Sequence, residues 1–274
     1  MLTIVNAALS LNMGLRAPVT PRAVAPSMNF YTVFHEFKVG KTEMSSDEFW
    51  GAIAGVDMAE MAKGQHESGI FNHYFMPGAV DGPMMCLWEC KDKEMGSDAF
   101  KAFIDGPESP AGGLLNKVYP ISDMGMTPAS AWPTMPAPGA KSAGSFFWVK
   151  HTFNEGTAEG FWENMATIDM DEFAAANKKK GFCNHLFMPT TDPSTVFCVW
   201  ESKAPMTAEE FAVFMDGPDG PAPGVFTNAV YPVMEGGTTP PAAFPISWMD
   251  ETMAKIEAFG EEALAKFEEV FKTA

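Results

Sequence analysis

Short segments of the chain are aromatic and β-branched, and longer ones repeat their apolar residues at helical spacing. Residues 31–37 (YTVFHEF) and 147–153 (FWVKHTF) have the composition of β-strands. Residues 46–67 and 158–180 place apolar side chains three or four positions apart, which predicts an amphipathic helix in each. A glycine follows each helical segment and is expected to end it. The chain therefore contains two similar strand–helix units.

A hairpin, a second helix and a last strand follow in each unit. In the first unit we expect the second hairpin strand at 84–90, the start of the second helix at 97–98 and the last strand at 115–120. In the second unit the same elements are expected at 195–201, 207–208 and 227–232. The order β-α-β-β-α-β is that of a ferredoxin-like unit, a four-stranded antiparallel sheet with two helices. The predicted fold class is therefore α+β.

The two units are copies of one another. GIFNHYFMP at 69–77 and GFCNHLFMP at 181–189 share six of nine residues at a spacing of 112. Other stretches recur at almost the same spacing, namely Phe49-Trp50 with Phe161-Trp162, Trp88-Glu89 with Trp200-Glu201, Asp105-Gly106-Pro107 with Asp216-Gly217-Pro218, and Val118-Tyr119-Pro120 with Val230-Tyr231-Pro232. A fixed period of this length indicates tandem duplication.

The duplication divides the chain into six parts. These are a disordered or targeting segment at 1–28, the first repeat at 29–121, a first Pro/Gly-rich arm and linker at 122–144, the second repeat at 145–233, a second Pro/Gly-rich arm at 234–246, and a C-terminal amphipathic helix at 247–274.

Both faces of each predicted sheet are apolar. In the first hairpin, regular alternation separates two sets of side chains, Phe71, His73, Phe75, Met84, Cys86 and Trp88 on one face and Tyr74, Met76, Met85 and Leu87 on the other. One face is expected to meet the helices of its own repeat. The other face needs a second sheet, which belongs either to the other repeat or to a neighbouring molecule.

The arms and the C-terminal helix are candidate contact surfaces. Each arm places an aromatic residue just before a proline, and this ring is expected either to anchor the arm in a pocket or to cover the core of its own domain. The C-terminal helix carries an apolar stripe at steps of three and four. The residues expected to make assembly contacts are Trp132, Phe244, Trp248, Met253, Ile256, Phe259, Phe267 and Phe271.

Charge argues against two classes of partner. The formal net charge is −17, which repels nucleic acid and anionic membranes, and no segment approaches the roughly 20 apolar residues that cross a bilayer. Residues 1–28 are instead basic, free of acidic residues and rich in alanine, serine and proline. This composition is typical of a chloroplast transit peptide, so we expect a protein of the plastid stroma.

The histidines and cysteines offer one candidate for catalysis. Counting back from the hairpin turns places His73 opposite Cys86 and His185 opposite Cys198, and a Cys–His pair can form a thiol nucleophile. Burial among aromatic residues makes such a thiol inert. The glutamate after each repeated tryptophan is expected on the other face, where it could not orient the histidine. We therefore expect no catalytic residue.

Metal and cofactor sites are not expected either. The sequence has no Walker A, GxGxxG, HExxH or GxSxG motif. Cys86 and Cys90 form a CxxxC pair with no second thiol pair or histidine run to complete a zinc site.

The duplicated architecture resembles two known groups of proteins. Each repeat is similar to the unit of the dimeric α+β barrel superfamily, in which two such sheets pack face to face. The order of domains, the duplication, the basic N-terminal segment and the C-terminal helix together resemble the pyrenoid shell proteins of diatoms and related algae. That resemblance implies a plastid structural protein, not an enzyme, that self-assembles into a sheet or tube around the Rubisco condensate and supports carbon fixation. Its partners would be copies of itself and Rubisco or other pyrenoid components.

The alternative is a single-chain α+β barrel protein that acts on or carries a small molecule. It would be a monooxygenase-like enzyme without a cofactor, or a small-ligand-binding protein related to stress responses. The side chains expected to line its lumen are His35, His73, Trp88, His151, His185 and Trp200.

Overall fold

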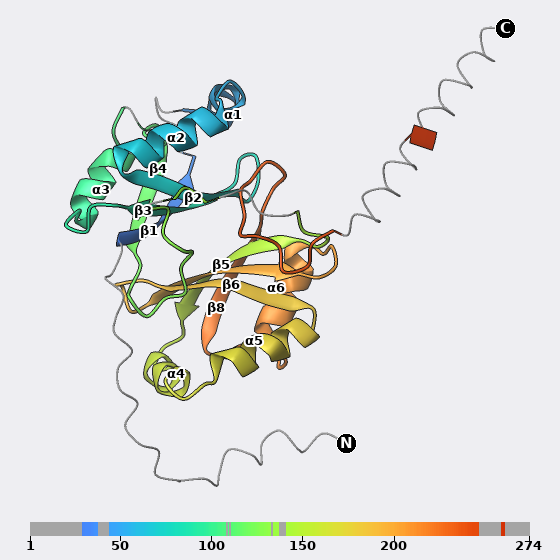
Figure 1. The fold of residues 1–274 in the computed structure, drawn as a ribbon. Helices are drawn as coiled ribbons and strands as arrows, with labels where there is room; N and C mark the ends of the chain where they lie inside the picture. The colour runs from blue at the N-terminus through green and yellow to red at the C-terminus, as the bar shows by residue number, and fades with distance from the viewer. Residues whose placement is uncertain are drawn as a thin grey trace, which may run out of the picture.

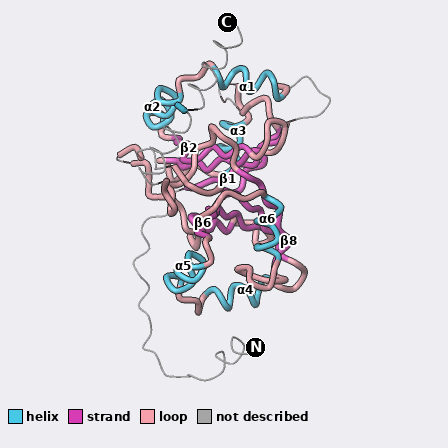
Figure 2. Tube along the Cα trace, turned by 90° about the vertical axis from the view of Figure 1, so that its right-hand side faces the viewer, coloured by secondary structure: helices cyan, strands magenta, loops and turns pink. Residues whose placement is uncertain are grey.

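Two four-stranded antiparallel sheets lie face to face, and helices cover the outer side of each (Figure 1). The computed structural model describes residues 29–37, 44–107, 109, 111–132, 134–136, 141–246 and 259–260. Seen from the side, α1 and α2 lie beyond one sheet and α4 and α5 beyond the other (Figure 2). The predicted α+β class and the tandem duplication are confirmed.

The two repeats have the same order of elements. The first contains β1 (Asn29–Glu36), α1 (Ser46–Ala54), α2 (Met58–Ser68), β2 (Ile70–Pro77), β3 (Met84–Cys90), α3 (Ser97–Ile104) and β4 (Leu115–Pro120). The second contains β5 (Phe146–Phe153), α4 (Ala158–Met165), α5 (Met170–Lys179), β6 (Phe182–Pro189), β7 (Thr195–Ser202), α6 (Ala208–Asp216) and β8 (Phe226–Pro232). The strand orders are β2-β3-β1-β4 and β6-β7-β5-β8.

Each predicted long helix is in fact two shorter ones. The break falls before Asp57 in the first repeat and before Asp169 in the second, and each aspartate accepts hydrogen bonds from two backbone N–H groups of the helix that it starts. An aspartate that caps a new helix stabilises the break, because it satisfies donors that a helix end leaves free. The prediction of one helix per segment is therefore wrong, although its outer limits agree with the structure.

A glycine ends α2 and α5, as the sequence predicts. Gly69 has φ of 84° and Gly181 has φ of 88°. Residues with a side chain rarely adopt this left-handed conformation, so glycine allows the chain to leave the helix and enter the next strand directly.

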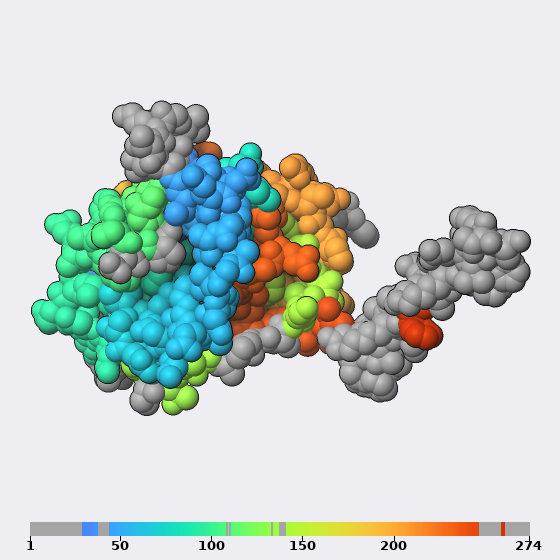
Figure 3. Space-filling view, turned by 90° about the horizontal axis from the view of Figure 1, so that it is seen from above, coloured from blue at the N-terminus to red at the C-terminus, as the bar shows by residue number. Residues whose placement is uncertain are grey.

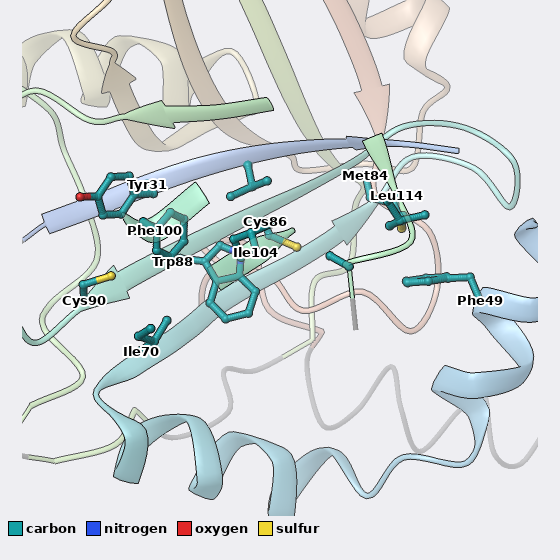
Figure 4. Close-up of a cluster of buried hydrophobic side chains, with 12 residues drawn as sticks. Tyr31, Phe49, Ile70, Met84, Cys86, Trp88, Cys90, Phe100, Ile104 and Leu114 are labelled. Carbon is teal, nitrogen blue, oxygen red and sulfur yellow. The ribbon is translucent and has the colours of Figure 1, made fainter. Parts of the chain in front are cut away.

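Three apolar cores hold the fold together. One lies between the first sheet and its helices, where Tyr31 stacks on Phe100 at a ring-centroid distance of 4.2 Å and Phe49 reaches from α1 toward Leu114 (Figure 4). A second core lies between the second sheet and its helices, and the third lies between the two sheets.

The core between the sheets is formed by the second apolar face of each sheet, the face turned away from its own helices. Trp148, which is fully buried in β5, stacks on Tyr231 at 4.0 Å and meets Phe34 of the first sheet edge-on at 5.6 Å. Met85 and Phe197 belong to the same cluster. The second face of each sheet therefore covers the other repeat rather than a neighbouring molecule. These side chains also fill the space between the sheets in which a lumen was expected.

The arms cross between the repeats before they return. In the first arm, Met126 exchanges backbone hydrogen bonds with Phe187 of β6, at 2.6 and 3.3 Å. In the second arm, Thr238 donates from its backbone N–H to the Phe75 oxygen of β2 at 2.7 Å. The space-filling view shows the orange-red part of the chain against the blue and cyan first repeat (Figure 3). Each arm thus ties its own repeat to the edge of the other sheet.

Both arm aromatics then pack on their own repeats. Trp132 stacks on His66 at 5.3 Å and donates from Nε1 to its backbone oxygen. The Phe244 ring lies 5.8 Å from the Lys178 Nζ. Each ring thus lies against a residue of its own repeat.

The predicted targeting segment and most of the C-terminal helix lie outside the described residues. Phe259 is described and is 74% exposed. Five further residues predicted to make assembly contacts lie outside the described ranges, namely Trp248, Met253, Ile256, Phe267 and Phe271. Among the described residues, no helix is both long enough and apolar enough to cross a membrane.

Candidate ligand-binding site

A cavity of about 590 Å³ lies on the helix side of the second sheet. Its walls come from α4, α5, the loop before β8 and the outer face of the sheet, and they are mostly apolar, as Phe161, Phe173, Phe187 and Met215 show. Pockets that bury small molecules in proteins have this size and character.

The matching space in the first repeat is almost completely filled by side chains. Its volume is about 50 Å³, although the residues around it correspond to those of the second repeat. Phe49 of α1 is only 4% exposed and fills this space together with Leu114 and Met84, whereas no residue of α4 is buried. The difference follows from how closely the first helix of each repeat packs on its sheet.

The floor of the open cavity carries polar groups without partners. His151 of β5 and Asn184 of β6 line it, and the His151 Nε2 and Asn184 Oδ1 atoms are buried and make no hydrogen bond. Trp200 of β7 lies among them, with its Nε1–H likewise unpartnered. Buried polar atoms are almost always hydrogen-bonded in native proteins, so unpaired ones at a cavity wall indicate that something else completes them.

A chain of hydrogen bonds sets the tautomer of His151. The side-chain amide of Asn228 donates to Asp216 Oδ1 at 2.7 Å, so its oxygen faces His151 Nδ1, at 2.6 Å, as an acceptor. His151 must then carry its proton on Nδ1, and Nε2 presents a lone pair to the cavity. Burial lowers the pKa of His151 to about 4, although its bond to Asn228 and the charge of Asp216 oppose that shift. The imidazole is therefore neutral at physiological pH.

The first repeat contains the same chain of groups. His35 Nδ1 lies 2.6 Å from Asn116 Oδ1, and the amide of Asn116 donates to Asp105 Oδ1 at 2.9 Å. His35 Nε2 is unpartnered as well, but the adjoining space has room only for something about as small as water. The polar groups are thus duplicated, and the cavity is not.

Acid is expected to destabilise the protein through these two histidines. Burial lowers the pKa of His35 and of His151 to about 4, while the unfolded value is 6.5, so the unfolded chain takes up protons first as the pH falls. The stability that each neutral imidazole contributes is complete above about pH 6.5 and is lost as the pH falls toward 4, with a loss of about 2 kcal/mol each by pH 5. Urea unfolding at pH 7.5 and pH 5 measures this loss, and His151→Gln should roughly halve it. Equal stability at both pH values would contradict the prediction.

The histidines of the repeated Asn-His pairs do not face cysteines. The predicted pairing assumed regular alternation, but the register of β2 against β3 shifts between Asn72 and Tyr74. This bulge places Phe75, and not His73, opposite Cys86, and the second repeat has the same bulge. A bulge adds one residue to a strand and changes which face the following side chains occupy. The proposed Cys–His pairing is therefore wrong.

The bulge instead pairs each of these histidines with a glutamate. His73 Nε2 lies 2.7 Å from Glu89, and His185 Nε2 lies 2.7 Å from Glu201. Both carboxylates are fully buried. The expectation that histidine and glutamate lie on opposite faces is wrong, because it used the alternation that the bulge interrupts.

Glu201 also holds the returning arms. It accepts hydrogen bonds from the Ser142 hydroxyl and from the backbone N–H groups of Ala243, at 2.6 Å, and Phe244, at 3.1 Å. Burial opposes ionisation, but the bonds from Ser142, Ala243, His185 and Phe244 outweigh it and lower the pKa of the Glu201 carboxyl. The equivalent glutamate of the first repeat accepts from its own arm in a similar way. This pair of sites is structural.

The six residues predicted for the alternative pocket therefore separate into three places. His35 and Trp88 border the closed space of the first repeat, His151 and Trp200 lie at the open cavity of the second, and the remaining two, His73 and His185, bind the buried glutamates. Burial raises the pKa of Cys86 and Cys198 to about 12, so both thiols are protonated, in agreement with the expected inertness.

Three residues of the site are not predicted from the sequence, namely Asn184, Asp216 and Asn228. Each recurs in the first repeat, as Asn72, Asp105 and Asn116. The sequence carries a second signal, because Asn116 follows Asp105 by 11 positions whereas Asn228 follows Asp216 by 12. The extra residue lengthens the loop that forms one wall of the cavity.

Comparisons with known proteins bear on the fold. The family profile described as "Domain of unknown function (DUF8652)" matches residues 30–128 and 146–240, and no curated protein matches the chain. A solved monooxygenase-like protein from Lactobacillus acidophilus NCFM is 13% identical with a TM-score of 0.44, over 79% of this chain and 98% of that one. A chlorite dismutase variant from Candidatus Nitrospira defluvii is 10% identical with a TM-score of 0.43, over 76% of this chain and 92% of that one.

The expectation of a shell-forming structural protein is wrong. It depended on apolar sheet faces that were free to bind neighbouring molecules, and those faces cover each other within the chain. The alternative of an α+β barrel protein with a small-molecule site agrees better with the geometry, and the site lies beneath the helices of the second repeat rather than between the sheets.

Proposed function

The chain belongs to the family described as the domain of unknown function DUF8652, and we propose that this member binds a small apolar molecule in its second repeat. One observation carries the proposal. The two repeats have the same polar groups beside the sheet, yet the space next to these groups is about 590 Å³ in the second repeat and about 50 Å³ in the first.

A purely structural role for these polar groups does not account for the difference. The chain of hydrogen bonds from Asp105 through Asn116 to His35 forms without a large cavity in the first repeat. Leaving a cavity in an apolar core costs stability, about 24 cal/mol per Å³ in measured cases. A large space beside one of two duplicated sets of polar groups is therefore best explained by an occupant.

An enzyme that removes a proton from the bound molecule is a second candidate. The observation in its favour is the unprotonated His151 Nε2 at the cavity wall. Its pKa of about 4 keeps the nitrogen in the basic form but makes it a weak base at neutral pH, whereas efficient proton abstraction needs a pKa near the working pH. Binding is accordingly the function that the site supports best.

Filling the cavity is expected to abolish binding without unfolding the protein. Cys198 lies on the cavity floor and Cys86 at the equivalent place in the closed repeat. Cys198→Phe places a ring in free space and should weaken binding of the neutral fluorescent probe N-phenyl-1-naphthylamine at least tenfold, as measured by titration of the full chain.

The equivalent substitution in the first repeat, Cys86→Phe, is the matched control. Cys86→Phe has no space to enter, so it should cost about 1–3 kcal/mol by overpacking and leave probe binding unchanged. Equal binding by wild type and Cys198→Phe, or no binding by wild type, would refute the proposal.

A further inference from the structure

We infer that the ligand is a neutral molecule whose apolar body fills the second-repeat cavity and whose hydroxyl group donates a hydrogen bond to His151 Nε2. The inference rests on the proposed function and assigns its ligand class. It depends on which hydrogen-bonding roles the cavity leaves open.

Most of the polar atoms without a partner at the cavity wall are hydrogen-bond acceptors. His151 is 3% exposed, and its Nε2 can only accept, because Nδ1 holds the proton that Asn228 requires. Asn184 presents its oxygen, since its amide nitrogen lies 3.9 Å from the Cys198 sulfur. A ligand that completes this wall must therefore bring hydrogen-bond donors.

The surrounding charge excludes an anionic ligand. Among the residues that the structure describes, no arginine or lysine lines the cavity, and the carboxylate of Asp216 stands behind His151 with Asn228 between them. A carboxylate or phosphate would meet the acceptors of His151 and Asn184, with the Trp200 Nε1–H as the unpartnered donor on the floor, and would lose its hydration without an opposite charge, which costs several kcal/mol. A hydroxyl group meets the same site as a donor and remains neutral.

The first repeat has the same acceptor beside a much smaller space. His35 Nε2 is equally unpartnered beside a space of about 50 Å³, which is enough for water and for little else. An O–H group is the donor that water would offer there. In the second repeat the same imidazole geometry faces a space that also has room for an apolar body behind the hydroxyl.

The position of His151 along the sheet places the ligand's hydroxyl group at one end of the cavity. His151 pairs with Val196 on β7, whereas Asn184 pairs with Trp200, four residues farther along the same strand. The two acceptors therefore mark opposite ends of the floor, with Cys198 between them. The end at His151 is the one enclosed by Phe226, whose ring centroid lies 5.0 Å from that of His151.

Three probes that share one aromatic body test the inference. Naphthalene, 2-naphthol and 2-naphthoate are compared at pH 7 by equilibrium dialysis against the full chain. We expect 2-naphthol to bind about five- to tenfold more tightly than naphthalene, the worth of one net hydrogen bond, and 2-naphthoate to bind most weakly. Preference for naphthalene or for 2-naphthoate would overturn the inference.

Two variants assign the preference to a residue. His151→Phe keeps a ring of similar shape without the nitrogen, so 2-naphthol should lose its advantage over naphthalene. The matched variant His35→Phe removes the equivalent imidazole from the closed repeat and should leave the preference as in wild type. A preference that survives in His151→Phe would overturn the inference, and so would its loss in His35→Phe alone.

The same measurements separate this inference from the proposed function. If naphthalene binds to wild type and not to Cys198→Phe, while 2-naphthol has no advantage, the cavity binds apolar molecules and only the hydroxyl assignment fails. If neither naphthalene nor 2-naphthol binds to wild type, the proposed function fails and the inference fails with it.

Discussion

Replacing Trp148 by alanine is expected to lower the free energy of unfolding by about 4 kcal/mol, in the range of measured Trp→Ala changes in cores. The side chain is completely buried between the sheets, stacks on Tyr231 at 4.0 Å and contacts Phe34 of the other repeat. Its removal therefore leaves a cavity at the contact that joins the two halves of the chain.

Urea unfolding, followed by far-ultraviolet circular dichroism, measures the loss. Val213→Ala is a suitable control, because Val213 is 74% exposed on α6 and its truncation should change stability by less than about 0.5 kcal/mol. A loss below 1 kcal/mol for Trp148→Ala would mean that the sheets do not pack on each other in solution. The apolar faces of the sheets would then be free to bind neighbouring molecules.

Replacing Glu201 by alanine is expected to cost about 3–5 kcal/mol, the usual effect of removing one partner from a buried ionic cluster. The carboxylate accepts from two backbone N–H groups of the second arm, from Ser142 of the first arm and from His185. Alanine leaves these donors buried without acceptors, and each such loss costs about 1–3 kcal/mol.

Hydrogen exchange distinguishes a local effect from a general one. In Glu201→Ala, the amides of Ala243 and Phe244 should exchange much faster than in wild type, while those in the centre of β7 follow only the global loss of stability. Glu201→Gln keeps the shape and one acceptor oxygen, so its loss should be smaller. Glu209→Ala, at an exposed position in the first turn of α6, is the control with a change near zero. Unchanged protection of Ala243 and Phe244 in Glu201→Ala would show that this carboxylate does not hold the arm.

Some features of the site were visible in the sequence only in part. The repeated Asn-His pairs indicate duplicated polar groups, and the structure separates the two residues of each pair, because Asn184 lines the cavity and His185 binds Glu201. Regular alternation counted back from the hairpin turn placed His185 opposite Cys198, but the bulge between Asn184 and Leu186 puts Phe187 there. A one-residue irregularity changes the face of a side chain without changing the hydrophobic pattern enough to be detected.

The sequence by itself determined the fold class, the duplication and the limits of most elements. Strand and helix periodicities identify which side chains share a face, and glycines such as Gly69 mark where the backbone must take a left-handed conformation. These are local properties, so they can be read from neighbouring residues.

Only the tertiary structure decided what lies opposite each face. The hydrophobic pattern around Trp148 and Met85 would be the same whether these side chains met the other repeat or another molecule. In the structure each packs on the sheet of the other repeat. The open cavity beneath α4 is similarly undetermined by composition, because corresponding residues surround a closed space in the first repeat. Its volume depends on how far a helix stands from a sheet, a distance set by the whole packing arrangement and not by any one segment.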